Sequence, residues 1–280
     1  MIAAILSLGC IGLVAAFALG LAAKKFAVEV DPRELAALEV LPGANCGACG
    51  YPGCAGFAKA VIEGKAELNQ CPPGGAEVVL KLSRILGVEA TAAEPEIAVV
   101  ICQGDNRKAQ LKYQYLGLDD CTAAQRVAGG PKACPGGCLG LGSCQRACPF
   151  DAIEMTDDGL AVISREKCTG CRKCIAVCPR NVIRMTPLAS SVHVLCNSHD
   201  KGALVRKYCQ IGCIGCHICK KTVPDAYQVE TFLATVVYGQ DEEAGEAIAK
   251  CPTQCIRDFQ DGYPEGSRLA PAGSEKTHAA

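Results

Sequence analysis

The sequence predicts an α+β protein in which an apolar N-terminal helix precedes several cysteine-rich units. Three observations predict this organisation. The chain holds 22 cysteines in 280 residues, mostly in tight runs; residues 2–23 carry no charge; and a cysteine-bearing segment near residue 150 returns in altered form near residue 225. Because Trp is absent and aromatic residues make up only 5%, we expect bound metal to supply cross-links that a large core would otherwise provide.

Residues 1–25 are predicted to be a transmembrane anchor. The uncharged stretch 2–23 is long enough to cross a bilayer as one helix. Lys24 and Lys25 follow at once, so the positive-inside rule places the cysteine-rich body on the cytoplasmic side of the inner (cytoplasmic) membrane, in a single-pass topology. A cleaved signal peptide fits less well, because no basic segment precedes the apolar stretch.

Residues 30–88 are predicted to form a small helical module with four cysteines. Residues 31–41 begin Asp-Pro and are typical of a short amphipathic helix, and a second helix is predicted from Ala76 to Leu86, where Gly87 ends it. Four thiolates can hold a [4Fe–4S] cluster or a zinc ion, and the spacing by itself leaves both possibilities open. The candidate ligands are Cys46, Cys49, Cys54 and Cys71.

A connecting segment is predicted over residues 96–130. The run IAVVIC at 97–102 is typical of a buried strand. The charged run at 105–112, DNRKAQLK, predicts a solvated helix, with a docking surface as the alternative.

Residues 131–190 are predicted to form a ferredoxin-like lobe with two clusters. Residues 168–179 read CTGCRKCIAVCP, the C-x2-C-x2-C-x3-C-P run of two-cluster ferredoxins. In that pattern three thiolates hold one [4Fe–4S] cluster and the fourth ligates its neighbour. The ligands expected for the first cluster are Cys148, Cys168, Cys171 and Cys174.

The second cluster of this lobe departs from the pattern. The three local ligand positions are Cys138, Leu141 and Cys144, and Leu141 cannot bind iron. Cys134 precedes a glycine-rich path and is expected to fold back into the gap. The ligands expected for this cluster are Cys134, Cys138, Cys144 and Cys178.

Residues 205–260 are predicted to be a second ferredoxin-like lobe that has kept one cluster. The segment CPTQCI at 251–256 matches CPRNVI at 178–183. Val223 stands where the remote cysteine of the other cluster would be, and the corresponding triplet is Asp241, Ala244 and Ala247. The ligands expected for the retained cluster are Cys213, Cys216, Cys219 and Cys251. Residues 261–280 are predicted to be a disordered tail.

These sites account for four [4Fe–4S] clusters and leave six cysteines. A fifth cluster is possible if four of them converge beneath the first lobe, and buried core thiols are the alternative. That set is Cys102, Cys121, Cys196 and Cys209. Cys255 is expected in the core. A disulfide scaffold is disfavoured, because it does not require the repeated C-x2-C-x2-C spacing.

The order of these motifs resembles that of the RnfB family. The resemblance rests on an anchor followed by CGACGYPGC, CLGLGSCQRACPFDAI and CTGCRKCIAVCPRNVI, and it covers the chain to about residue 260. It implies that Cys46, Cys49, Cys54 and Cys71 bind a cluster rather than zinc. The longer family members have a second ferredoxin lobe, as this chain does.

The resemblance also implies a function. RnfB is part of a membrane-bound ferredoxin:NAD oxidoreductase that couples electron transfer to Na⁺ or H⁺ translocation. The expected partners are soluble ferredoxin and the other Rnf subunits, and this chain is expected to perform electron relay only. The net charge of −1 points to no nucleic-acid partner. The alternatives are an electron-transfer subunit of another membrane oxidoreductase and a zinc-binding scaffold.

Overall fold

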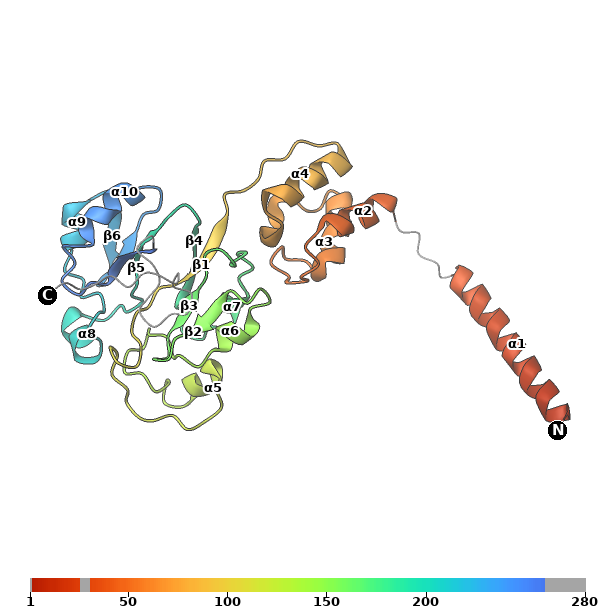
Figure 1. The fold of residues 1–280 in the computed structure, drawn as a ribbon, viewed down its shortest axis with the longest axis horizontal. Coiled ribbons are helices and arrows are strands. Elements are labelled where there is room, and N and C mark those ends of the chain that lie inside the picture. The colour runs from red at the N-terminus through yellow and green to blue at the C-terminus, as the bar shows by residue number, and fades with distance from the viewer. Residues whose placement is uncertain (1, 26–30, 260–280) are drawn as a thin grey trace.

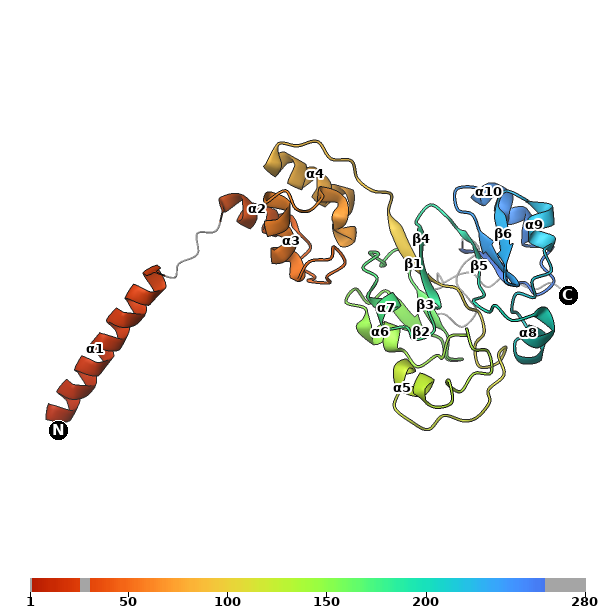
Figure 2. The same cartoon turned by 180° about the vertical axis from the view of Figure 1, so that it is seen from behind.

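The computed structural model describes residues 2–25 and 31–259, with side chains throughout except at 2–8, 23, 241 and 242. Mixed helices and short strands build the chain, as the α+β prediction requires. Both views place the first ferredoxin-like lobe between the N-terminal module and the second lobe (Figures 1 and 2). The tail predicted at 261–280 lies outside the described residues.

The N-terminal residues form helix α1, Ile2–Lys25, and Lys24 and Lys25 lie in its last turn. Large apolar side chains around it are exposed, among them Leu13 and Phe17 at 74% and 70%. Among the residues whose side chains the structure describes, which in this helix leave out 2–8 and 23, no helix is both long and apolar enough to cross a membrane. The helix that the sequence predicts is present, and its crossing of a membrane stays a prediction.

The N-terminal module packs three helices, α2 (Pro32–Val40), α3 (Gly53–Ile62) and α4 (Gly75–Leu86), with two 3₁₀ turns, η1 (Leu68–Gln70) and η2 (Pro72–Gly74). The Asp31 carboxylate caps α2 by accepting the Arg33 N–H at 2.8 Å. Gly87 ends α4 in the left-handed conformation, as predicted. Phe57 and Leu82 are buried between the helices and fix how they pack.

The first ferredoxin-like lobe contains two antiparallel strand pairs. Strand β1 (Glu96–Val100) pairs with β4 (Ile183–Pro187), and β2 (Ile153–Met155) pairs with β3 (Ala161–Ile163). Strand β1 contains Ile97, Val99 and Val100, and such β-branched residues favour strands. Its position is close to the strand predicted over residues 97–102. Three short helices complete the lobe: α5 (Cys121–Arg126), α6 (Ser143–Ala147) and α7 (Lys173–Ala176).

The helix predicted over 105–112 is wrong. The buried Asp105 carboxylate accepts the N–H groups of Arg107 and Lys108 at 2.9 and 2.8 Å, which closes a turn instead. Beyond the turn the backbone is extended, and Ala109 and Leu111 form isolated bridges with Cys209 and Lys132. The Asp105 side chain therefore favours a turn over a helix at this point. The extended residues that follow contact the second lobe.

The second lobe repeats the plan of the first. Strand β5 (Val192–Val194) pairs with β8 (Ile256–Asp258), and β6 (Tyr227–Glu230) pairs with β7 (Leu233–Val236). The helices are α8 (Gly202–Tyr208), α9 (Ile218–Thr222) and α10 (Asp241–Ala244), followed by the 3₁₀ turn η3 (Gly245–Ala247).

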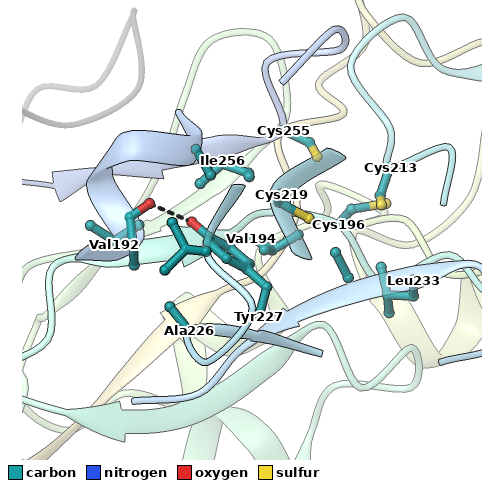
Figure 3. Packing of buried hydrophobic residues seen from close by; sticks show 14 residues of the cluster. Val192, Val194, Cys196, Cys213, Cys219, Ala226, Tyr227, Leu233, Cys255 and Ile256 are labelled. Atoms are coloured by element: carbon teal, nitrogen blue, oxygen red, sulfur yellow. Dashed lines mark hydrogen bonds between the residues drawn. The ribbon is translucent and has the colours of Figure 1, made fainter. Parts of the chain in front are cut away.

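Apolar packing fills the position of the cluster that the second lobe lacks. Val223, Ala244 and Ala247, which occupy cysteine positions of the motif, are buried in one core with Tyr227. The Tyr227 hydroxyl donates to the Ala244 carbonyl at 2.7 Å, drawn as the dashed line in Figure 3. Core side chains thus stand where a second cubane would need space.

Candidate iron–sulfur sites

The four thiols of the N-terminal module lie together. Burial raises the pKa of Cys71 to about 11, and its thiol lies within electrostatic reach of Cys46, Cys49 and Cys54. The Asn45 side-chain oxygen accepts the Cys54 N–H at 2.8 Å and holds the loop against the start of α3. The loop needs glycine at Gly53, where φ is +82° and an added Cβ would lie 2.7 Å from that same oxygen.

The thiols of the C-x2-C-x2-C run also gather as the motif predicts. Burial raises the pKa of Cys174 to about 12, and its thiol lies within electrostatic reach of Cys148, Cys168 and Cys171. The backbone N–H of Ala98 in β1 donates to the Cys168 sulfur at 3.4 Å. Strand β1, far away in sequence, thus supplies a hydrogen bond of the kind that tunes a cluster sulfur.

The other site of the first lobe contains a cysteine that sequence reasoning placed elsewhere. One pocket is lined by Cys121 together with Cys138, Cys144 and Cys178, and Cys134 is not among its lining residues. The Cys144 thiol lies within electrostatic reach of all three of these thiols and of Cys174. The fold therefore offers Cys121 at the position that Leu141 leaves without a ligand.

Local structure explains how Cys121 reaches that pocket. Asp120 caps α5 by accepting the Ala123 N–H at 2.7 Å, and its other carboxylate oxygen accepts the Ser143 hydroxyl at 2.9 Å. The same Ser143 oxygen accepts the Cys121 N–H at 2.8 Å. Ser143 begins α6, the helix that carries Cys144, so one polar contact ties the two cysteine-bearing helices together. The unused cysteine beside an N-capping Asp was the available sequence signal.

Cys134 lies in a different pocket, with Cys102, Cys196 and Cys209. Its thiol lies within electrostatic reach of Cys102 and Cys209. This pocket lies between the two lobes, because Cys102 and Cys134 belong to the first lobe, whereas Cys196 follows β5 and Cys209 ends α8 in the second.

The second lobe gathers Cys213, Cys216, Cys219 and Cys251 in one pocket, together with Cys255. Cys255 is buried, as predicted, and its sulfur lies 3.6 Å from that of Cys251. Hydrogen bonds from the Cys255 thiol hold the pKa of Cys213 and Cys251 below the ordinary value. Figure 3 shows the Cys213, Cys219 and Cys255 side chains at one end of the apolar core.

The chemistry of these pockets fits iron–sulfur clusters. The pockets of Cys121, Cys134 and Cys213 are lined by cysteines, apolar residues and uncharged polar groups, with Arg180, His217 and Tyr208 as the other titratable residues and no carboxylate. Within residues 2–25 and 31–259, no three His, Cys, Asp or Glu side chains are grouped closely enough to hold a single metal ion.

The module faces the first lobe across an open cavity. The cavity has a volume of ≈ 480 Å³, and Cys49 and Cys71 line it on one side and Cys168 and Arg172 on the other. The Cys171 thiol also lies within electrostatic reach of Cys46. The thiols of the module and of the first lobe are therefore neighbours.

Comparisons with known proteins agree with this chemistry. A family model for an Fe-S cluster matches residues 41–73, a 4Fe-4S dicluster domain matches residues 133–185, and a 4Fe-4S single cluster domain of Ferredoxin I matches residues 210–258. The chain's cofactors are therefore [4Fe–4S] clusters, and the ferredoxin-like lobes that the sequence predicts are confirmed.

Relatives match over most of the chain. The B component of the Na(+)-translocating ferredoxin:NAD(+) oxidoreductase complex of Acetobacterium woodii is 42% identical over 89% of this chain and 75% of its own length. The B component of the ion-translocating oxidoreductase complex of Methanosarcina acetivorans is 40% identical over 84% and 90%. The B component of the proton-translocating ferredoxin:NAD(+) oxidoreductase complex of Clostridium ljungdahlii is 42% identical over 90% of both chains. The thiol-lined sites and these matches lead to one conclusion: the chain belongs to the RnfB family, the B components of ion-translocating oxidoreductase complexes.

Proposed function

We propose that this chain takes single electrons from reduced soluble ferredoxin and relays them to partner subunits of an Rnf-type complex. The observation that carries the proposal is that the thiol groups of successive sites lie next to one another in space. Cys46 of the module neighbours Cys171 of the first lobe, and Cys174 neighbours Cys144 of the next site within that lobe. A series of closely spaced redox centres is what electron relay needs. Each [4Fe–4S] cluster accepts and gives up one electron at a potential set by charge, hydrogen bonding and exposure.

The ligand assignment follows the pockets. The module supplies Cys46, Cys49, Cys54 and Cys71, and the first lobe supplies Cys148, Cys168, Cys171 and Cys174 to one cluster. For the other cluster of that lobe we assign Cys121 in place of Cys134, together with Cys138, Cys144 and Cys178. The second lobe supplies Cys213, Cys216, Cys219 and Cys251. These four sites account for about sixteen irons per chain, at four for each cubane.

We also propose that α1 anchors the chain in the cytoplasmic membrane as a single span. Two features of the helix support this. Its described apolar side chains are exposed, which in water would cost hydrophobic free energy, and Lys24 and Lys25 follow its apolar stretch. The cysteine-rich body then lies on the cytoplasmic side, where reduced ferredoxin is available. The relatives' names mention Na⁺ and proton translocation and NAD⁺, and we assign those steps to other subunits.

The relay is tested by mixing the anaerobically purified full chain with reduced ferredoxin and following the visible absorbance. The electron leaves the ferredoxin cluster, which is oxidised, and enters this chain, which is reduced. We expect bleaching of this chain's absorbance, with matching oxidation of the ferredoxin. Ferredoxin that stays reduced beside intact, oxidised clusters would refute the proposed function.

The ligand assignment is tested separately by Cys121→Ser, with Cys10→Ala as the matched control. Cys121→Ser should remove one EPR signal of the first lobe, while Cys10→Ala should leave the spectrum unchanged because Cys10 lies in α1. An unaltered spectrum for Cys121→Ser would refute its role as a ligand.

A further inference from the structure

The pocket between the two lobes has the features of a further cluster site. Its four cysteines come from four segments: Cys102 follows β1, Cys134 precedes α6, Cys196 follows β5 and Cys209 ends α8. Its cavity volume is ≈ 20 Å³, the same as that of the pockets of Cys121 and Cys213, which the ferredoxin motifs mark as cluster sites. An apolar cavity lined by Val99 and Ile163 has the same volume. The pocket between the lobes is therefore distinguished by its four thiols and not by its size.

Two glycines lie against these sulfurs. A Cβ added at Gly104 would lie 3.6 Å from both the Cys102 and the Cys209 sulfur and 3.2 Å from the Ala109 Cβ. A Cβ added at Gly212 would overlap the Val205 side chain, so packing on α8 explains that glycine. The backbone of Gly104 thus approaches two of the four sulfurs closely.

Backbone N–H groups surround these sulfurs, and two of them donate to Cys102. Gly104 and Cys138 each donate to the Cys102 sulfur at 3.4 Å. Backbone groups of Gly136, Ser198 and Ile211 lie near the sulfurs of Cys134, Cys196 and Cys209. Two N–H donors to one sulfur are typical of a thiolate that binds a cluster.

Two buried cations lie beside this pocket without a carboxylate partner. Lys132 and Arg180 are 1% and 6% exposed, and within the described residues neither has an ion pair. Lys132 donates to the Gly104 carbonyl, and Arg180 donates to the carbonyl of Cys134. Buried charges are normally paired, because desolvation without a partner is costly. A cluster ligated by four thiolates is an anion, since the thiolates outweigh the positive charge of the cube. It would supply the missing partner of Lys132, whereas Arg180 also lines the pocket of Cys121 and has the cluster assigned there as a second partner.

We propose that Cys102, Cys134, Cys196 and Cys209 bind a fifth [4Fe–4S] cluster, which bridges the two ferredoxin-like lobes. The bridging position follows from two contacts. The Cys102 sulfur accepts the N–H of Cys138, a ligand in the first lobe, and the Cys196 thiol lies beside Cys213, a ligand in the second. This set keeps three members of the group that the sequence singled out and exchanges Cys121 for Cys134. The electron-carrying role of the bridge rests on the proposed function, whereas the binding site does not.

Iron content tests the site. After anaerobic reconstitution of the full chain, we expect a plateau of about twenty irons, four for each of five cubanes. Cys209→Ser should lower the plateau by about four and remove one EPR signal, while the control Cys10→Ala should keep about twenty. Cys209 is chosen because its sulfur makes no hydrogen bond to a ligand of the neighbouring clusters within the described residues, whereas the Cys102 sulfur accepts one from Cys138.

The wild-type plateau decides the matter even if Cys209→Ser fails to fold. A plateau of about sixteen irons, or a Cys209→Ser protein that keeps the wild-type content, would overturn the fifth cluster. Failure here is distinct from failure of the proposed function. Sixteen irons that reduced ferredoxin bleaches would reject the bridge alone, and twenty irons that ferredoxin cannot reduce would reject the relay alone.

Discussion

Gly140 provides a quantitative test of how the first lobe is held together. It lies between Cys138 and Cys144, its φ is +77°, and an added Cβ would stand 2.2 Å from the carbonyl oxygen of Gly159, in the turn between β2 and β3. Gly140→Ala therefore incurs two costs. The left-handed conformation costs an alanine about 1–2 kcal/mol, and relieving the overlap with the backbone costs about 1–3 kcal/mol more. The sum is roughly 2–5 kcal/mol.

The matched control is Gly129→Ala in the same lobe. Gly129 has a similar φ of +72°, but its added Cβ would meet nothing closer than the Lys112 Nζ at 4.0 Å. Only the conformational cost then applies. Because about 1 kcal/mol shifts the melting temperature by roughly 2–4 °C in a protein of this size, Gly140→Ala should melt roughly 2–12 °C below Gly129→Ala. The assay is the temperature at which iron–sulfur absorbance bleaches under anaerobic conditions. Equal bleaching temperatures for the two variants would refute the proposed close packing of the loop on the hairpin.

Three further predictions address potentials and packing. Lys132→Met should lower the potential of at least one cluster in an EPR-monitored redox titration, because it removes a buried positive charge that favours reduction, while surface Lys81→Met should not. Cys255→Ala should leave the iron content unchanged and lower the potential of the second-lobe cluster, since it removes the hydrogen bond to the Cys251 sulfur; an unchanged potential would count against that hydrogen bond. Tyr227→Phe should cost about 1–3 kcal/mol by leaving the buried Ala244 carbonyl without its partner, seen as a lower bleaching temperature at constant iron content; an unshifted temperature would contradict it.

The zinc alternative for the N-terminal module illustrates what motif spacing can and cannot decide. The spacing of Cys46, Cys49, Cys54 and Cys71 suits four-coordinate zinc as well as a cubane. The match of residues 41–73 to an Fe-S cluster model favours the cubane. The thiols of the module also lie beside those of the first lobe, where an inert ion would serve no relay.

The sequence by itself determined the character of this protein. Local spacing in CTGCRKCIAVCP marks a ferredoxin lobe, because three thiolates on one short turn must meet the same cube. Local rules also predicted α2, the end of α4 at Gly87 and the approximate position of β1. The substitution of Val223 predicted the loss of one cluster from the second lobe, and its burial in an apolar core agrees.

Only the tertiary structure decided which distant cysteines share a pocket. The sequence predicted Cys134, the nearby cysteine beside a glycine-rich path, at the gap left by Leu141. The capping Asp120 and its hydrogen bond to Ser143 instead bring Cys121 to that pocket. Cys134 lies with cysteines that follow β5 and end α8, a meeting that depends on how two lobes pack. Spacing along the chain fixes contacts within one turn, whereas contacts between lobes depend on long-range packing that no local pattern records.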